Sequence, residues 1–144
     1  MKNLIHTSAL MAIVLMSLYS CEKEDNEPES VLTAGTITIE KTEVNCCQLG
    51  NGLRGTQFTY SIPYEAPDGM EVVRVEYTSK RSNGSTNSGE YNTAPDTHDG
   101  VINGYITLVF TTSDWVEESY TLVSSTGLKS NPSVIRFDKP PGAN

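Results

Sequence analysis

Residues 57–64 read QFTYSIPY, and this stretch decides the fold class because apolar and polar side chains alternate along it. A period of two is the spacing of a β-strand, whose successive side chains point to opposite faces of a sheet. The apolar face carries Phe58, Tyr60, Ile62 and Tyr64. The stretch therefore predicts a half-buried strand with an inner face rich in aromatic rings.

The same spacing returns after a turn. Residues 67–69 (PDG) have the composition of a tight turn. Residues 71–80 (EVVRVEYTSK) then place Val73, Val75 and Tyr77 on one face. Two alternating runs separated by a short turn are typical of a β-hairpin. We therefore expect these two strands to pair with each other.

The pattern continues on either side of these runs. Ile37 and Ile39 alternate with polar residues, which predicts another half-buried strand. Asn83-Gly84 is a pair that type I′ turns prefer, because both central residues of that turn need a positive φ. A short strand is expected after this turn, around residues 90–93.

Three strand candidates lie in the C-terminal half, at residues 101–112, 119–125 and 133–138. The first carries apolar side chains on both faces, which favours a central position in its sheet. Between the first two, Asp114 and Glu117 have the spacing of a capping box, which predicts one helical turn.

These elements predict an all-β fold. Many short strands separated by turn residues, with no long helix, are typical of a single β-sandwich of about seven strands. We expect this domain over residues 35–139, followed by a disordered tail at residues 140–144. About 110 residues are enough for one hydrophobic core and too few for two.

The C-terminal third carries a family resemblance. Tyr120 is followed by alternating aliphatic residues, a glycine turn, Ser130-Asn131-Pro132 and a closing strand. This order resembles the last two strands of fibronectin type III domains, and it implies an immunoglobulin-like sandwich in which Tyr120 matches the family's corner tyrosine. Trp115 is one residue out of step with the family's apolar residue before that corner. The family's early tryptophan is absent, and Phe58 or Tyr60 would fill its space.

The N-terminus has the features of a lipoprotein signal peptide over residues 1–20. Lys2 gives a positive start, and residues 9–18 form an apolar segment of about 10 residues, whereas about 20 are needed to span a bilayer. Residues 18–21 (LYSC) resemble the lipobox of bacterial lipoproteins, which implies cleavage before Cys21 and a lipid on its sulfur. The alternatives are an ordinary cleaved signal with an incidental cysteine, or a short anchoring helix.

The segment after Cys21 is acidic. We expect residues 21–34 to be a flexible tether, because the segment is charged and contains proline. Lys23 among acidic residues resembles the export signal of surface lipoproteins of the Bacteroidota. This resemblance implies a lipid-anchored protein on the cell-surface side of the outer membrane. The alternatives are a generic spacer and a domain on the periplasmic face.

The charge balance limits the partners. Cleavage before Cys21 removes Lys2 and no acidic residue, so 9 basic residues face 18 acidic ones and the formal charge becomes −9. Such a surface disfavours nucleic acid and anionic lipid as direct partners. The expected partners are the membrane, through the lipid anchor, and a glycan or protein ligand.

Cys46 and Cys47 are the two cysteines besides Cys21. Adjacent side chains on a strand point to opposite faces, so a bridge between them needs a distorted peptide geometry. One buried and one partly exposed free thiol is the simplest interpretation. A vicinal disulfide is the main alternative, because an exported protein meets oxidising conditions. Intermolecular pairing and metal binding remain open, although the spacing does not match a zinc site.

The one histidine of the mature chain, His98, lies between Asp96 and Asp99. Pro, Asp and Gly at these places form turns on their own account, and a turn is the main interpretation. A hard cation such as calcium is the alternative. The chain has no nucleophile elbow, phosphate-binding glycine loop or zinc-protease motif, so neither an enzyme nor a cofactor is predicted.

Aromatic residues in loops are the candidates for binding. Tyr91 is expected to be an exposed ring in a polar loop, and Trp115 is expected to cap the core, with ligand binding as its alternative role. Loops near Tyr91 and His98 are expected to contact the ligand. The sequence favours a noncatalytic binding or adhesion module. The alternatives are a structural accessory of an outer-membrane assembly and a small hydrolase.

Overall fold

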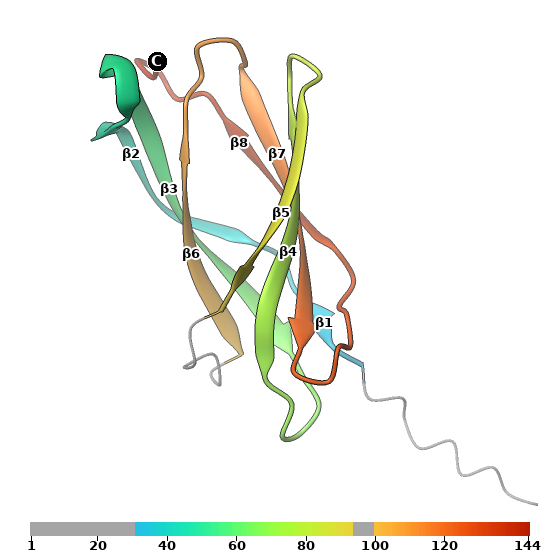
Figure 1. Ribbon diagram of the computed structural model, residues 1–144. Coiled ribbons are helices and arrows are strands. Elements are labelled where there is room, and N and C mark those ends of the chain that lie inside the picture. Colours follow the sequence, from blue (N-terminus) through green and yellow to red (C-terminus); the bar gives the residue numbers. More distant parts are fainter. Residues whose placement is uncertain (1–30, 94–99) are drawn as a thin grey trace, which may run out of the picture.

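The computed structural model describes residues 31–93 and 100–144, which form two antiparallel β-sheets packed face to face (Figure 1). The all-β sandwich is confirmed, with eight strands where about seven were expected. Within the described residues, no helix is long and apolar enough to cross a membrane. The predictions for residues 1–30, which include the signal peptide, Cys21 and most of the tether, lie outside the described residues.

The first sheet contains β1 (Thr33–Ala34), β2 (Thr38–Gln48), β3 (Arg54–Glu65) and β6 (Val101–Leu108). β3 is central, because β1 and β2 pair with one of its sides in succession and β6 pairs with the other. The sequence predicted a central position for the strand at residues 101–112, because that stretch has apolar residues on both faces. This prediction is wrong: in the described part of the chain β6 pairs only with β3, and β3 is the central strand. A short 3-10 turn, η1 (Gly50–Gly52), connects β2 to β3.

The second sheet has the order β5 (Thr86–Asn92), β4 (Val72–Arg81), β7 (Trp115–Ser124) and β8 (Ser133–Asp138). The bounds of β8 agree with the prediction. The predicted helical turn at Asp114–Glu117 is wrong, because Trp115 already pairs with Asp138 in the β7–β8 ladder.

The expected hairpin of β3 and β4 is also wrong. β3 pairs with β1, β2 and β6, whereas β4 pairs with β5 and β7, so the chain crosses to the other sheet between them. The two apolar faces meet across the core. A register shift between Val72 and Arg74 turns Val72 and Val75 inward and leaves Val73 39% exposed, against its predicted inward position. Likewise Ile37 is buried but Ile39 is 38% exposed.

The turn between β4 and β5 is not of type I′. Among the described residues Gly84 has a φ of 85° but Asn83 has no positive φ. The Gly84 N–H donates to the Arg81 carbonyl and the Arg81 N–H donates to the Ser85 carbonyl, both at 2.9 Å. This pattern is a three-residue loop that ends in a glycine bulge. The Asn83 side chain stabilises it by accepting the Ser85 N–H at 3.0 Å.

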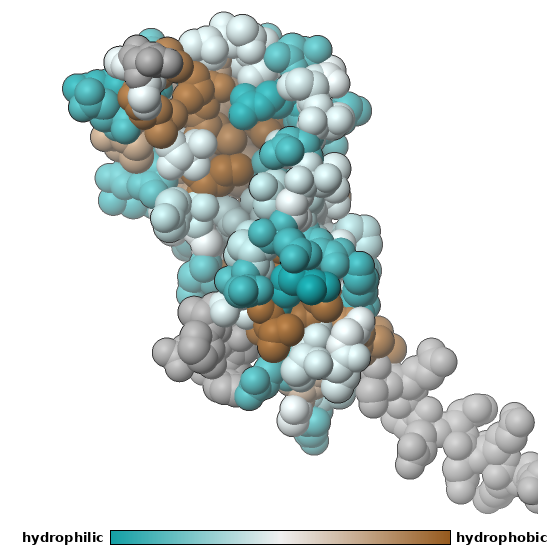
Figure 2. Space-filling model, in the orientation of Figure 1, coloured by the Kyte–Doolittle hydropathy of each residue, from teal (hydrophilic) through white to brown (hydrophobic). Residues whose placement is uncertain are grey.

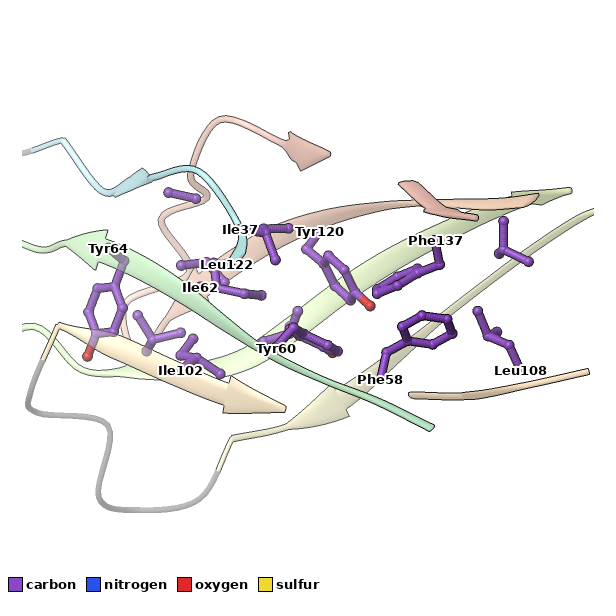
Figure 3. Close-up of a cluster of buried hydrophobic side chains, with 14 of the residues drawn as sticks. Ile37, Phe58, Tyr60, Ile62, Tyr64, Ile102, Leu108, Tyr120, Leu122 and Phe137 are labelled. Carbon is purple, nitrogen blue, oxygen red and sulfur yellow. The ribbon is translucent and has the colours of Figure 1, made fainter. Parts of the chain in front are cut away.

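Aromatic rings fill the space between the sheets (Figure 3). The Phe58 ring centroid lies 4.9 Å from that of Phe137 and 6.2 Å from that of Phe110. The ring centroids of Tyr60 and Tyr120, which come from opposite sheets, lie 5.3 Å apart. Phe58 and Tyr60 thus occupy the core as expected, while Tyr120 lies within β7 and not at a corner before the strand.

The folded body is wider than residues 35–139. Leu32 is fully buried, so the expected tether is already part of the domain there. The expected disordered tail is packed: Ala143 is buried and the Phe110 N–H donates to the Asn144 carbonyl at 2.6 Å. The Asn45 side chain explains this order, because its Nδ2 donates to the Gly142 carbonyl at 2.7 Å.

Candidate functional site

A cleft of about 330 Å³ opens between the sheets, at the edge where β5 of one sheet faces β6 of the other. Its volume is at the lower end of the range found for small-molecule sites. Five tyrosines line it: Tyr60, Tyr77, Tyr91, Tyr105 and Tyr120. The polar lining also includes Ser79, Arg81, Asn87 and Glu118.

Two glycines on the edge strands make room for these rings. Gly104 of β6 pairs with Tyr60 of β3, and a Cβ on Gly104 would lie 2.8 Å from the tyrosine ring. Gly89 of β5 pairs with Tyr77 of β4, and its Cβ would lie 2.7 Å from the tyrosine hydroxyl. In both sheets a tyrosine from an inner strand therefore lies across a glycine of the edge strand and faces the cleft.

Three tyrosine hydroxyls gather on the floor of the cleft. The hydroxyls of Tyr60 and Tyr91 are 3.3 Å apart, and Figure 3 shows Tyr60 beside Tyr120 in the interior. Burial raises the pKa of Tyr60, Tyr91 and Tyr120. All three hydroxyls therefore stay protonated at neutral pH, where each can both donate and accept a hydrogen bond.

Glu118 is the one acidic residue among those that line the cleft, and the residue is only 2% exposed. It lies on the inner face of β7 between Val116 and Tyr120, opposite Ser79 of β4. Burial raises the pKa of the Glu118 carboxyl above its ordinary value of 4.5, and a hydrogen bond from Ser79 and the charge of Arg81 act in the opposite direction. Burial is the largest of these effects.

The two predicted binding residues in the described part of the chain, Tyr91 and Trp115, do not come together. Tyr91 lies in β5 and not in a loop, and its hydroxyl faces the cleft. Trp115 does not cap the core, because it lies half-buried on the outer face of β7 with the Arg136 guanidinium 4.7 Å from its ring. Tyr105 is 70% exposed, which makes it the most exposed of the tyrosines that line the cleft.

The other predicted site lies elsewhere in the chain. His98, Asp96 and Asp99 lie outside the described residues, so the interpretations as a turn or a cation site stay predictions. Within residues 31–93 and 100–144, no group of three or more His, Cys, Asp or Glu side chains is placed to hold a metal ion.

Cys46 and Cys47 are joined in a vicinal disulfide at the end of β2, and not left as two free thiols. The strand is distorted there: Glu43 pairs with Gln57 and Cys47 with Gly55, so β2 has two extra residues, and Asn45 has a φ of 51°. The distortion removes the alternation that would separate the two sulfurs. Figure 2 shows apolar atoms gathered at this end of the molecule, where Val44, Leu49 and Leu53 are exposed.

Sequence reasoning missed Glu118 and the two glycines. A signal for Glu118 was present, because it occupies an inward position between the apolar Val116 and Tyr120 on an alternating strand. A charged residue in such a position is rarely buried without a reason. The role of Gly89 and Gly104 can be recognised only from the strand register, which shows the tyrosine that each glycine faces.

Comparisons with known proteins do not identify a family for this chain. No protein-family model matches the chain, and no curated protein matches it. A solved structure that matches is the X-ray structure of Northeast Structural Genomics Consortium target SoR45, with a TM-score of 0.45 and 11% sequence identity. The match covers 78% of this chain and 90% of that one. Function is therefore inferred from the cleft itself.

Proposed function

We propose that this chain is a noncatalytic binding module, and that its ligand, a glycan or a protein, contacts the cleft between β5 and β6. A lipid on Cys21 holds the module at the cell-surface side of the outer membrane. The observation that carries the proposal is the cleft itself, a space of about 330 Å³ whose lining includes five tyrosines and one buried glutamate.

The chemistry of the lining supports binding. Tyrosine rings offer flat apolar faces with a polar end, a combination suited to recognition. A few polar groups in a largely aromatic cleft fix the orientation of a ligand. Glu118 is the single carboxylate of the lining, whereas glycoside hydrolysis generally uses a pair. These features favour recognition over turnover.

Binding arrays test the site. We expect the full chain to bind members of a glycan and protein array and Tyr91→Ala to lose that binding, because the substitution removes one wall of the cleft. Val134→Ala, on β8 at the other edge of the sandwich, is the matched control and should bind as the unaltered chain does. Equal binding by both variants would place the ligand elsewhere.

The anchor is tested separately. Mass spectrometry of the native protein should find a lipid on the Cys21 sulfur, and protease treatment of intact cells should remove the domain without lysis. Cys21→Ser should move the protein from the membrane fraction to the soluble fraction, because stable anchoring depends on the acyl chains. An unmodified Cys21 sulfur in the native protein contradicts the anchor.

A further inference from the structure

We infer that the cleft recognises a protonated amine, with the Glu118 carboxylate as its counter-ion and the tyrosine rings as its walls. This inference rests on the proposed function, since it names the chemical group of the ligand that the same cleft receives. Primary ammonium groups occur on amino sugars and on lysine side chains, so both kinds of ligand in the proposal offer this chemistry.

The carboxylate of Glu118 is buried in the cleft. Glu118 lies at the floor of the cleft with 2% of its surface exposed, and a carboxylate that leaves water loses free energy unless it gains charged or hydrogen-bonding partners. The Ser79 hydroxyl supplies one donor. Because an ionised carboxylate can accept about four hydrogen bonds, the Glu118 carboxylate can accept others from a ligand besides the one from Ser79.

Glu118 has no direct counter-ion in the described part of the chain. The ion pairs found there use Glu43, Glu76, Glu90 and Asp138, and none includes Glu118. Arg81 is the one cationic residue of the lining. Its Nη1 donates to the Val109 carbonyl at 3.1 Å and to the Ser113 hydroxyl at 3.4 Å, which holds the guanidinium in other contacts.

Aromatic residues form much of the cleft lining. Ring centroids lie 5.3 Å apart for Tyr60 and Tyr120 and 6.5 Å apart for Tyr77 and Tyr91, so several rings line one small space. Aromatic faces attract cations through the ring quadrupole, and clusters of rings bind ammonium groups. The tyrosine hydroxyl oxygens add hydrogen-bond acceptors.

The strand register indicates where the ammonium group lies. Along β4 and β7, Ser79 pairs with Glu118, Arg81 pairs with Val116 on one side of it, and Tyr77 pairs with Tyr120 on the other. The charge of Arg81 repels a cation, so the ammonium group is placed on the tyrosine side of Glu118. The formal charge of −9 expected for the mature chain adds a long-range attraction for cations.

Titration calorimetry with paired probes tests the inference on the full chain. The pairs are glucosamine with glucose and butylamine with butanol, at a pH where both amines are protonated. We expect at least one amine to bind at least tenfold more tightly than its neutral partner, and added salt to weaken the binding. Preference for glucosamine indicates an amino sugar, and preference for butylamine indicates a lysine side chain.

Glu118→Gln is the decisive variant, because it keeps the shape of the side chain and removes its charge. It should lower the amine affinity at least tenfold. Glu117→Gln changes the neighbouring residue on the outer face of β7 and should leave the affinity unchanged. Thermal melting confirms that both variants are folded.

The outcomes separate this inference from the proposed function. Equal binding of amines and neutral partners, no binding of any probe, or an unchanged amine affinity in Glu118→Gln overturns the inference. If Tyr91→Ala still abolishes array binding in those cases, the cleft remains the binding site and only the ammonium assignment fails. If Tyr91→Ala has no effect on the array either, both proposals fail.

Discussion

The two edges of the sandwich are built in different ways. At the edge of β1 and β8, side chains at the start of β8 and in the loop before it bind the backbone of β1 and of the residue after it. Asn131 accepts the Ala34 N–H at 3.1 Å and donates to the Ala34 carbonyl at 3.2 Å, and Ser133 donates to the Gly35 carbonyl at 2.6 Å. At the edge of β5 and β6, Gly89 and Gly104 leave room for tyrosine rings and a cleft.

The difference separates stability from recognition. Hydrogen bonds to the backbone hold the first edge closed, so its polar groups are satisfied within the protein. At the second edge, aromatic rings and a buried carboxylate face a space that a ligand can enter. The sandwich thus combines a closed edge at β1 and β8 with an open edge at β5 and β6. If the two edges are independent, a substitution at one edge should leave the other unchanged.

Phe137→Ala should have the largest effect, because Phe137 belongs to the core that both edges share. Its ring is fully buried and lies 4.9 Å from that of Phe58. We expect the free energy of unfolding to fall by about 3–5 kcal/mol, as for other buried rings, measured by urea unfolding. Val134→Ala on the same strand is 55% exposed and should change it by less than about 0.5 kcal/mol. Similar losses for both would contradict this account of the core.

Gly104→Ala should disturb the open edge. The new methyl would lie 2.8 Å from the Tyr60 ring, so the ring or the strand must move. Overpacking of this kind costs about 1–3 kcal/mol in urea unfolding, and the displaced ring should also weaken ligand binding. Gly50→Ala is the matched control, because no atom lies within 4 Å of its added methyl. Wild-type stability and binding in Gly104→Ala would show that the glycine does not shape the cleft.

Asn131→Ala should loosen the closed edge and leave the open one unchanged. Both hydrogen bonds to Ala34 are lost, which should cost about 1–2 kcal/mol and speed hydrogen exchange at the Ala34 amide. Asn131→Asp keeps the acceptor for the Ala34 N–H but places an oxygen against the Ala34 carbonyl, so it should also destabilise this edge. A change in ligand affinity in either variant would mean that the two edges are coupled.

The sequence predicts the faces of the strands better than their partners. Alternation identifies the buried Phe58, Tyr60 and Ile62 and the bounds of β8, because burial depends on local periodicity. It cannot distinguish a neighbour in the same sheet from a strand across the core, since both require the same inward face. The supposed hairpin of β3 and β4 fails for this reason.

Of the residues that line the cleft, the sequence selected one, Tyr91, as a candidate binding residue. Tyr91 was selected as an exposed loop ring, yet it serves the cleft because β5 extends to Asn92 and turns its side chain inward. Trp115 was misplaced because the capping signature of Asp114 and Glu117 is local, whereas pairing of β7 with β8 is a tertiary effect. The role of Gly104 depends on register, which single-sequence patterns do not contain.

Glu118→Gln should have the smallest effect on stability, visible as a dependence on pH. Burial raises the pKa of Glu118 in the folded state above its ordinary value of 4.5. Below about pH 4 the carboxyl is protonated in both the folded and the unfolded chain, so the wild type carries no penalty there. As the pH rises through the raised pKa, a charge forms in the buried site and stability is lost. The variant avoids this loss.

The groups that face Glu118 do not obscure the test. The hydroxyls of Tyr60, Tyr91 and Tyr120 have pKa values raised by burial, so they stay neutral between about pH 4 and pH 8. Glu76, whose pKa the Lys129 ammonium lowers, is present in both proteins and cancels in the difference. Urea unfolding at several pH values should therefore show that the free energy of unfolding of Glu118→Gln increases relative to that of the wild type as the pH rises. A constant difference would mean that Glu118 is as well solvated in the folded protein as in the unfolded chain, and that the open edge holds no uncompensated charge for a ligand to neutralise.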